Sequence, residues 1–188
     1  MMQSATDEEL MLAYTAGDAA AFDTLYGRYR APLFRYVRRQ VGEDRIAEEI
    51  FQDTWMRVIK ARDRYAASAK FTTWLFTIAH NRVMDHFRSA RAKPEEVPLL
   101  ANDEDDPEVA ASDTDNPESS LTRARLAERI LEALDALPAV QREAFVLQQE
   151  GDLTVEEIAT VTGVTRETAK SRLRYALAKL RRDLEDMR

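Results

Sequence analysis

The acidic stretch over residues 94–120 constrains this chain more than any other part of its sequence. It holds ten Asp and Glu residues and four of the six prolines, and it contains no Lys or Arg. Such a segment has too few large apolar side chains to offset the entropy cost of ordering its backbone. We therefore expect a flexible acidic linker at residues 94–120 that joins two folded domains, residues 1–93 and residues 121–188.

The net charge of the whole chain conceals how differently the three segments are charged. The sequence has 27 Lys and Arg against 34 Asp and Glu, which gives a formal net charge of −7. Residues 1–93 hold 15 basic and 12 acidic residues, and residues 121–188 hold 12 of each. The acidic average comes from the linker, so it does not argue against a nucleic-acid partner for either domain.

Composition also limits the cellular setting. The absence of cysteine excludes a disulfide framework, a thiolate zinc site and a thiol nucleophile. The first ten residues are polar and acidic, and no run approaches the ~18 apolar residues that a membrane span needs. We expect a cytoplasmic protein without export or membrane insertion.

Both domains are predicted to be all-α. The chain has only five glycines and no alternating β-branched run, whereas apolar residues recur at helical spacing. Pro32 is expected to kink or restart a helix. The clearest apolar stripes are Ile46, Ile50, Thr54 and Val58 in the first domain and Leu126, Ile130, Leu134 and Leu137 in the second.

Residues 154–184 have the pattern of a helix-turn-helix. Thr154 and Glu157 form a capping box at the start of a short helix, and Gly163 suits a left-handed turn before a longer helix that begins after Thr165. The polar face of that last helix carries hydroxyl and basic side chains, which can contact phosphates and base edges. The pattern favours DNA binding, and the alternative is an amphipathic helix whose polar face meets only water.

The second domain resembles a known family at the level of its sequence. The segment LPAVQREAFVLQQEGDLTVEEIATVTGVTRETAKSRLRYALAKLRRDL is similar to the C-terminal promoter-binding domain of extracytoplasmic-function (ECF) sigma factors of the sigma-70 family. The segments DEELMLAYTAGDAAAFDTLYGRYRAPLFRYVRRQ, IAEEIFQDTWMRVI and FTTWLFTIAHNRVMDHFRS are similar, in order, to parts of that family's first domain. The resemblance implies a sigma-2-like domain at residues 1–93, a sigma-4-like helix-turn-helix domain at residues 121–188, and a subunit that directs RNA polymerase to promoters.

The resemblance assigns residues 46–59 to docking on the clamp of core RNA polymerase. Carboxylates there can meet basic partner side chains, and aromatic residues can anchor the interface. Alternatively, the two aromatic residues belong to the core and the carboxylates form a solvated face. The expected polymerase-binding residues are Glu48, Glu49, Phe51, Gln52, Asp53 and Trp55.

Residues 65–88 are similar to the part of the family that melts the promoter and captures single-stranded bases of the minus-ten element. Aromatic faces can stack on unpaired bases, and polar or basic groups can hold base edges and phosphates. The alternative is that Phe71 and one of Trp74 and Phe76 are buried. The expected minus-ten residues are Tyr65, Ser68, Phe71, Trp74, Phe76, Asn81, Arg82, Asp85 and Arg88.

The resemblance assigns reading of the minus-thirty-five element to the last helix, with Arg174 and Tyr175 as the strongest individual candidates. The acidic linker has two open interpretations: a solubilising tether, or a polyanion mimic that enters polymerase channels for nucleic acid. The expected minus-thirty-five residues are Arg166, Thr168, Lys170, Ser171, Arg172, Arg174 and Tyr175.

No sequence motif indicates catalysis or a metal site. The chain has no glycine-rich phosphate loop and no Ser-His-Asp candidate. His80 and His86 lie about 240° apart around one predicted helix, so they cannot share a metal, and each is expected at the surface or beside DNA. We expect no enzyme activity, no metal and no cofactor.

The partners implied by the resemblance are the clamp and flap regions of bacterial core RNA polymerase and promoter DNA, with an anti-sigma factor as a further candidate and no membrane contact. Two other functions stay open on sequence alone. One is a stand-alone regulator that uses only the helix-turn-helix and binds duplex DNA as a dimer. The other is a helical protein-interaction adaptor.

Overall fold

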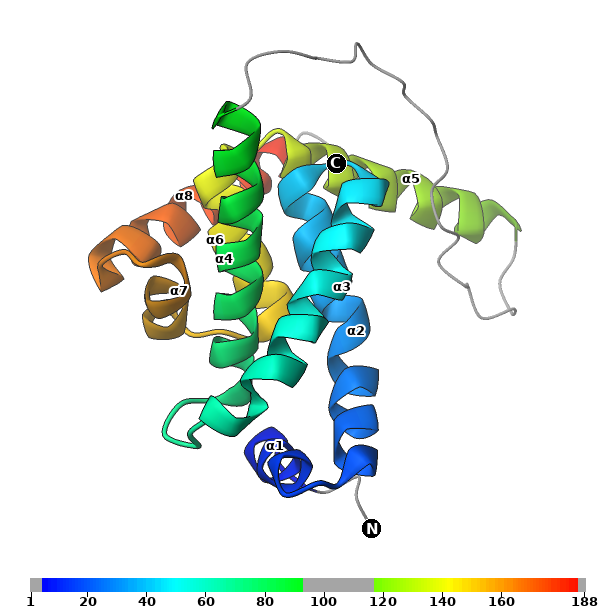
Figure 1. Cartoon of the computed structure of the whole chain (residues 1–188). Coiled ribbons are helices and arrows are strands. Elements are labelled where there is room, and N and C mark those ends of the chain that lie inside the picture. Colours follow the sequence, from blue (N-terminus) through cyan, green and yellow to red (C-terminus); the bar gives the residue numbers. More distant parts are fainter. Residues whose placement is uncertain (1–4, 93–116, 186–188) are drawn as a thin grey trace.

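The structure is a computed structural model that describes residues 5–92 and 117–185, with side chains described at residues 5–91 and 125–185. Every regular element in these ranges is helical, which confirms the predicted all-α class. The predicted flexibility of the linker falls on residues outside the described ranges. The helices, labelled in Figure 1, are α1 (Asp7–Thr15), α2 (Ala19–Val41), α3 (Asp44–Ala61), the 3-10 turn η2 (Arg62–Arg64), α4 (Phe71–Ala92), α5 (Pro117–Asp135), α6 (Ala139–Gly151), α7 (Val155–Thr162) and α8 (Arg166–Glu185).

The first domain consists of α1 to α4. Helices α2, α3 and α4 lie beside one another, and α1 closes one end of them (Figure 1). The stripe predicted on α3 faces this core: Ile50, Thr54 and Val58 are fully or almost fully buried. The Thr54 hydroxyl donates to the carbonyl oxygen of Ile50 at 2.7 Å, so the polar atom is satisfied inside the core.

Helix α2 continues through Pro32, contrary to the expected restart. Proline removes one backbone hydrogen bond, which normally weakens a helix interior. Here Leu33 and Tyr36, which follow the proline, are fully buried, so tertiary packing holds the second half of the helix against the core. The helix ends at Gly42, whose φ of 76° is the left-handed conformation that favours glycine.

The second domain consists of α5 to α8 and contains the predicted helix-turn-helix. Thr154 and Glu157 form the expected capping box at the start of α7, and Gly163 ends that helix with φ 66°. Thr165 then accepts a hydrogen bond from the backbone N–H of Thr168 at 3.2 Å, which caps α8. The predicted linker ended at residue 120, but α5 already begins at Pro117, because proline suits the first position of a helix.

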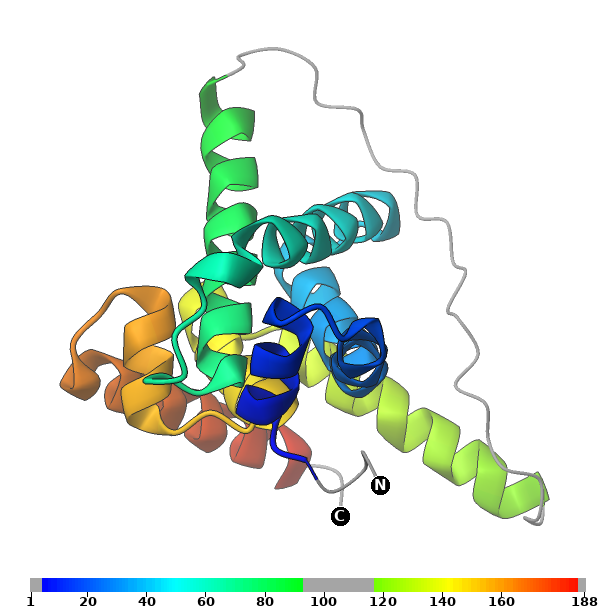
Figure 2. The same cartoon turned by 60° about the horizontal axis from the view of Figure 1, so that its bottom comes forward.

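The apolar stripe of α5 is only partly used. Leu137 is buried against α8, together with Ala133, Ala176 and Leu180. Leu126 remains 48% exposed, and α5 extends away from the rest of the molecule at that end (Figure 2). The apolar periodicity therefore predicted the helix correctly, but fewer of its apolar side chains are buried than the periodicity indicated.

The two domains pack directly against each other. Helix α6 lies against α2, and α7 lies against α4 (Figure 1). Phe76 of α4 is fully buried between Tyr36, whose ring it meets edge-on, and the end of α6. A Cβ atom on Gly151 would lie 3.0 Å from the Phe76 ring, so the close approach depends on this glycine. The two domains share one continuous hydrophobic core.

A buried carboxylate lies at the centre of this interdomain contact. Glu143 of α6 is 5% exposed, and its Oε1 accepts a hydrogen bond from the Tyr36 hydroxyl at 2.9 Å. His80 Nδ1 lies 2.7 Å from the same oxygen. Burial, together with the charge and hydrogen bond of Glu143, raises the pKa of Tyr36 well above its ordinary value. The expectation that His80 lies at the surface or beside DNA is wrong, because this carboxylate holds it in the interface.

Ion pairs surround the buried contact on the more exposed rim. Arg35 of α2 binds both carboxylate oxygens of Glu150 at 2.6–2.9 Å, a bidentate geometry. Lys70, just before α4, lies 3.0 Å from Glu157 of α7. Both pairs join the first domain to the second, so charge complementarity adds to the apolar contact.

We expect Glu143→Ala to lower the free energy of unfolding by about 1–3 kcal/mol, because it leaves the buried Tyr36 hydroxyl without an acceptor. Urea denaturation followed by tryptophan fluorescence measures this loss. Glu143→Gln should cost less, since an amide oxygen can still accept from Tyr36. Glu132→Ala, an exposed position of α5, is the matched control. Equal stability of Glu143→Ala and Glu132→Ala would contradict a stabilising role for the buried carboxylate.

Candidate nucleic-acid and polymerase interfaces

The polar face of α8 is open to solvent in the docked structure. Ala169, Leu173 and Ala176 turn into the core and fix the rotation of the helix. Opposite Leu173 lie Thr168, Ser171 and Tyr175, with Lys170, Arg172 and Arg174 on the flanks of that face and Arg166 in the first turn of the helix. These seven residues are the ones predicted for the minus-thirty-five element. Of these, Arg166, Thr168, Lys170, Arg174 and Tyr175 are exposed, and Ser171 and Arg172 are half-buried.

Arg174 and Tyr175 form an ordered pair on this face. The Arg174 guanidinium lies 5.0 Å from the centroid of the Tyr175 ring, within cation–π range. Tyr175 is nevertheless 54% exposed, so both planar groups face outward. A stacked guanidinium keeps its fork of N–H donors free for a base edge or a phosphate.

Arg166 is less free than its neighbours. Its guanidinium donates to Glu156 of α7 and lies 3.3 Å from Glu167. The hydrogen bond from Arg166 lowers the pKa of Glu156, and the same contact raises the pKa of Arg166. A phosphate at this position would have to compete with two carboxylates, whereas Lys170 forms no ion pair within the described residues.

The residues predicted for the minus-ten element divide into an open set and a buried set. Ser68 in the loop before α4 is exposed, and so are Asn81 and Arg88 along α4. Trp74 is half-buried, with its ring 5.2 Å from that of Tyr65. These four side chains form the open part of the predicted surface.

The buried set requires a correction. Phe71 and Phe76 are fully buried and Tyr65 is 8% exposed, so none of the three has a free face on which a base could stack. Phe71 packs between the rings of Tyr29 and Trp74, and Phe76 lies in the interdomain contact. Their assignment as base-stacking residues does not hold in this structure, because the helical core uses the same aromatic surface.

The face of α3 predicted to bind polymerase is also only partly open. Glu48, Glu49 and Gln52 are exposed and Phe51 is half-buried, but Trp55 is 5% exposed. Trp55 packs against the rings of the first domain's core, so its assignment as an interface anchor needs correcting.

The structure adds Met56 to the exposed face of α3. This side chain is 49% exposed and lies one turn after Gln52, which itself follows Glu48 by one turn. We call Glu48, Gln52 and Met56 the α3 ridge. Met56 was not among the residues predicted from the sequence. Its position outside the buried stripe of Ile50, Thr54 and Val58 could have indicated that its side chain is exposed.

Residues predicted for different partners are joined in one ion-pair network between α3 and α4. Asp53 accepts hydrogen bonds from Arg82 at 2.5 Å and from Arg57 at 3.2 Å. Asp85 lies 3.7 Å from Arg57 and accepts from Arg88 at 3.0 Å. Sequence reasoning assigned Asp53 to polymerase, and Arg82 and Asp85 to DNA. In the structure they neutralise each other, so only Arg88, whose side chain is 77% exposed, stays largely open.

No group of three or more His, Cys, Asp or Glu side chains in residues 5–92 and 117–185 is arranged to hold a metal ion. None of the helices in those ranges is both long and apolar enough to cross a membrane.

Comparison with known protein families gives two matches that follow the domain division. Residues 25–93 match the family described as Sigma-70 region 2, and residues 127–180 match Sigma-70, region 4. The first match contains α3 and α4, and the second contains the helix-turn-helix.

Curated relatives are similar over nearly the whole chain. The RNA polymerase sigma factor CarQ of Myxococcus xanthus is 31% identical over 177 residues, which are 94% of this chain and 97% of CarQ. The ECF RNA polymerase sigma factor SigL of Mycobacterium tuberculosis is 32% identical over 92% of this chain and 93% of its own length. The ECF RNA polymerase sigma factor BldN of Streptomyces coelicolor is 34% identical over 97% of this chain and 67% of its length.

Solved structures share the fold. CnrH, in complex with the cytosolic domain of CnrY, superposes with a TM-score of 0.64 at 23% identity, covering 96% of this chain and 97% of CnrH. The sigma factor RpoE, in complex with the anti-sigma factor NepR from Bartonella quintana, also gives 0.64, at 22% identity, covering 89% of this chain and 98% of RpoE. The family matches in both domains and the similarity to CarQ and SigL over nearly their whole lengths show that the chain belongs to the ECF sigma factors of the sigma-70 family, the subunits that direct RNA polymerase to promoters.

Proposed function

We propose that this sigma factor selects promoters through two DNA surfaces, one on each domain, and that it carries out no reaction of its own. One observation supports this most: α8 is anchored in the core by Ala169, Leu173 and Ala176 while its opposite, polar face stays exposed. A helix held in this way can enter the major groove without rearranging its own domain.

On the minus-thirty-five element, the pair of Arg174 and Tyr175 is the expected base-reading centre. Arginine can bond the O6 and N7 atoms of guanine with two N–H groups. Lys170 and the N-terminus of α8, which carries a partial positive charge, are expected to hold phosphates. The same helix would thus both position the domain and read sequence.

On the minus-ten element, the open residues Ser68, Trp74, Asn81 and Arg88 are expected to contact the separated strand. Arg88 suits a phosphate, and Asn81, two turns earlier on the same face of α4, suits a base edge. Trp74 has the only half-open ring among the aromatic residues predicted for this element that the structure describes. It is therefore the expected stacking platform.

The α3 ridge is the expected contact with the polymerase clamp. It combines a carboxylate at Glu48, an amide at Gln52 and the flexible apolar side chain of Met56. Methionine adapts to irregular partner surfaces, and an apolar centre with a polar surround is the usual anatomy of a protein interface.

The docked arrangement and the promoter-bound arrangement must differ. By their names, the two promoter elements lie about 25 base pairs apart, or about 85 Å along straight B-DNA at ~3.4 Å per base pair. A compact chain of this length has a radius of gyration of only about 16 Å. We therefore infer that the contact between α6 and α2 opens when both surfaces engage one promoter.

We further propose that the protein acts in the cytoplasm, beside core polymerase, and that an anti-sigma factor regulates it. The proposed regulation by an anti-sigma factor is supported by the similar fold of RpoE, whose structure is in complex with the anti-sigma factor NepR. It requires a surface that such a partner can cover, and the α3 ridge and the open face of α8 are the candidates.

In vitro transcription tests the proposed function. Core polymerase would transcribe fragmented genomic DNA with and without this protein, and RNA 5′ ends would be mapped. New start sites that share two upstream sequence blocks are expected. Specific binding to duplex DNA as a dimer, with no new start sites and no comigration with core polymerase, would instead support a stand-alone regulator.

Arg174→Ala should weaken promoter binding by the polymerase holoenzyme by about 1–3 kcal/mol and relax the preference at one base pair of the minus-thirty-five element. Binding to a set of single-base promoter variants measures both effects. Arg181→Ala, at an exposed position near the end of the same helix, is the control. A uniform loss over all promoter variants would make Arg174 a phosphate contact rather than a base-reading residue.

A charge swap separates the structural role of Asp53 from a role in polymerase docking. Asp53→Arg should lower stability, because it places a third guanidinium beside Arg57 and Arg82. Adding Arg82→Asp should recover about 1 kcal/mol in urea denaturation. Polymerase affinity, measured on the same proteins, should stay low because residue 53 still lacks a negative charge.

Glu48→Arg is the matched comparison, since Glu48 is exposed and forms no ion pair among the described residues. It should weaken polymerase binding without loss of stability. If the Asp53→Arg/Arg82→Asp protein recovers both stability and affinity, Asp53 only positions the helices.

A further inference from the structure

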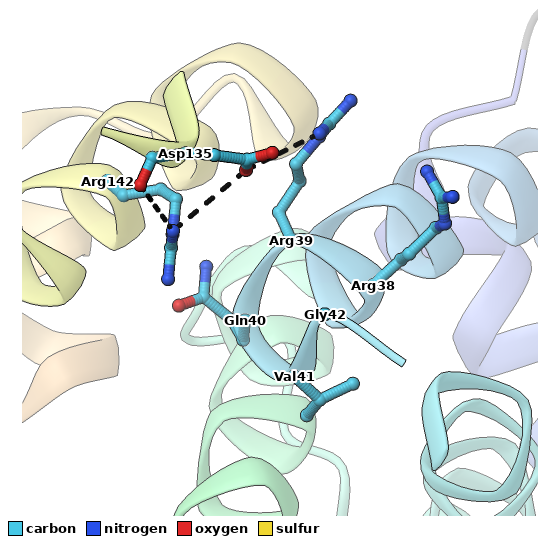
Figure 3. A pocket seen from close by; sticks show the side chains of 7 residues that line it. All are labelled: Arg38, Arg39, Gln40, Val41, Gly42, Asp135 and Arg142. Atoms are coloured by element: carbon cyan, nitrogen blue, oxygen red, sulfur yellow. Dashed lines mark hydrogen bonds and ion pairs between the residues drawn. The ribbon is translucent and has the colours of Figure 1, made fainter. Parts of the chain in front are cut away.

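A cavity of about 250 Å³ lies between the end of α2 and the start of α6, on the seam of the two domains. Figure 3 shows side chains from both domains facing one another across it. None of the residues that line this cavity is among those assigned to DNA or polymerase. Its lining residues are Arg38, Arg39, Gln40, Val41, Gly42, Asp135 and Arg142.

The charge of the cavity is unbalanced. Three arginines line it and Asp135 is its one acidic residue. Arg38 pairs with Asp44 and points away from the other side chains in Figure 3. Arg39 and Arg142 share Asp135, at 3.6 and 3.9 Å, which is too long for hydrogen bonds. Nη1 of Arg142 donates a hydrogen bond to the backbone carbonyl oxygen of Asp135 at 3.3 Å, but the Asp135 carboxylate forms no hydrogen bond with either guanidinium group.

Two buried N–H donors in the cavity have no acceptor. They are Nε2 of Gln40 and Nε of Arg142, and the two side chains lie next to each other in Figure 3. Most buried donors in folded proteins are hydrogen-bonded, because an unpaired one costs free energy. Both belong to residues that line the same space, one from each domain, so a single acceptor group between them would satisfy both.

We propose that this cavity binds a small anion that carries a diphosphate or similar phosphate group. A phosphate presents oxygens in tetrahedral directions, so it can accept from Arg39 and Gln40 of α2 on one wall and from Arg142 of α6 on the other. Guanidinium forks match phosphate oxygens, and the cavity has room for more than one phosphate.

The site exists only while the domains are docked, because α2 supplies Arg39 and Gln40 and the second domain supplies Arg142. A ligand that binds one of two conformations stabilises it in proportion to its concentration. The bound anion would therefore hold the docked arrangement. That consequence for promoter engagement rests on the proposed function, whereas the binding site itself does not.

Isothermal titration calorimetry of the full chain with inorganic pyrophosphate tests the site, in a phosphate-free buffer at constant ionic strength. We expect saturable one-to-one binding that Arg142→Gln weakens about tenfold or more. Arg64→Gln, an exposed position near η2, should leave the affinity unchanged. Equal affinity of the wild type and Arg142→Gln, or heat that follows ionic strength alone, would overturn the proposal.

If Arg142→Gln disturbs folding, Gln40→Met tests the same site. It removes an unpaired donor from a space of similar volume, so thermal unfolding of the free protein should not change. Pyrophosphate affinity should nevertheless fall several-fold. A Gln40→Met protein that binds pyrophosphate as tightly as the wild type would contradict the assigned role of Gln40.

A second basic surface needs its own control. Pyrophosphate could instead bind the exposed face of α8, so Arg174→Gln is titrated in parallel. Loss of binding in Arg174→Gln with none in Arg142→Gln would place the anion on α8 and overturn the proposal. Calorimetry involves neither polymerase nor promoter, so its result is independent of the test of the proposed function.

Discussion

The contact of Glu143 with Tyr36 and His80 is the interaction on which the arrangement of the whole molecule depends. A carboxylate that is 5% exposed needs hydrogen-bond partners, and both of those found here belong to the other domain. Apolar packing alone would allow α6 to slide along α2, since it is not directional. The buried polar contact selects one register, and with it the fit of Phe76 against Gly151 and the cavity lined by arginines.

Different faces of helix α4 have different surroundings in this arrangement. Leu75 and Val83 lie in the shared hydrophobic core, and Phe76 and His80 contact Gly151 and Glu143 of the second domain. Only a third face, with Asn81 and Arg88, is open. In the docked arrangement the polar face of α8 is exposed but part of α4 is buried, so the two proposed DNA surfaces are not equally accessible.

The ion pairs between α3 and α4 connect the helix proposed to bind polymerase with the helix proposed to contact DNA. Asp53, on the helix of the α3 ridge, binds Arg82, on the helix proposed to contact the minus-ten element. Removing Asp53 would leave Arg82 without its hydrogen-bonded carboxylate, whereas removing Arg82 would leave Asp53 paired with Arg57 alone. If α3 contacts polymerase and α4 contacts DNA, as proposed, these ion pairs connect the two surfaces by direct electrostatics.

The sequence by itself determined the helical class, the division into two domains, the capping box at Thr154 and the basic face of α8, because each depends on local spacing or on charge along one segment. It could not decide which aromatic residues are buried. Phe71, Phe76 and Trp55 have the same chemistry as Trp74, and only the packing of several helices separates them. Tertiary structure likewise decided that His80 meets Glu143, 63 residues away, and that Arg82 meets Asp53. Contacts between distant segments depend on how the helices pack in three dimensions, and the spacing within any one helix carries no information about them.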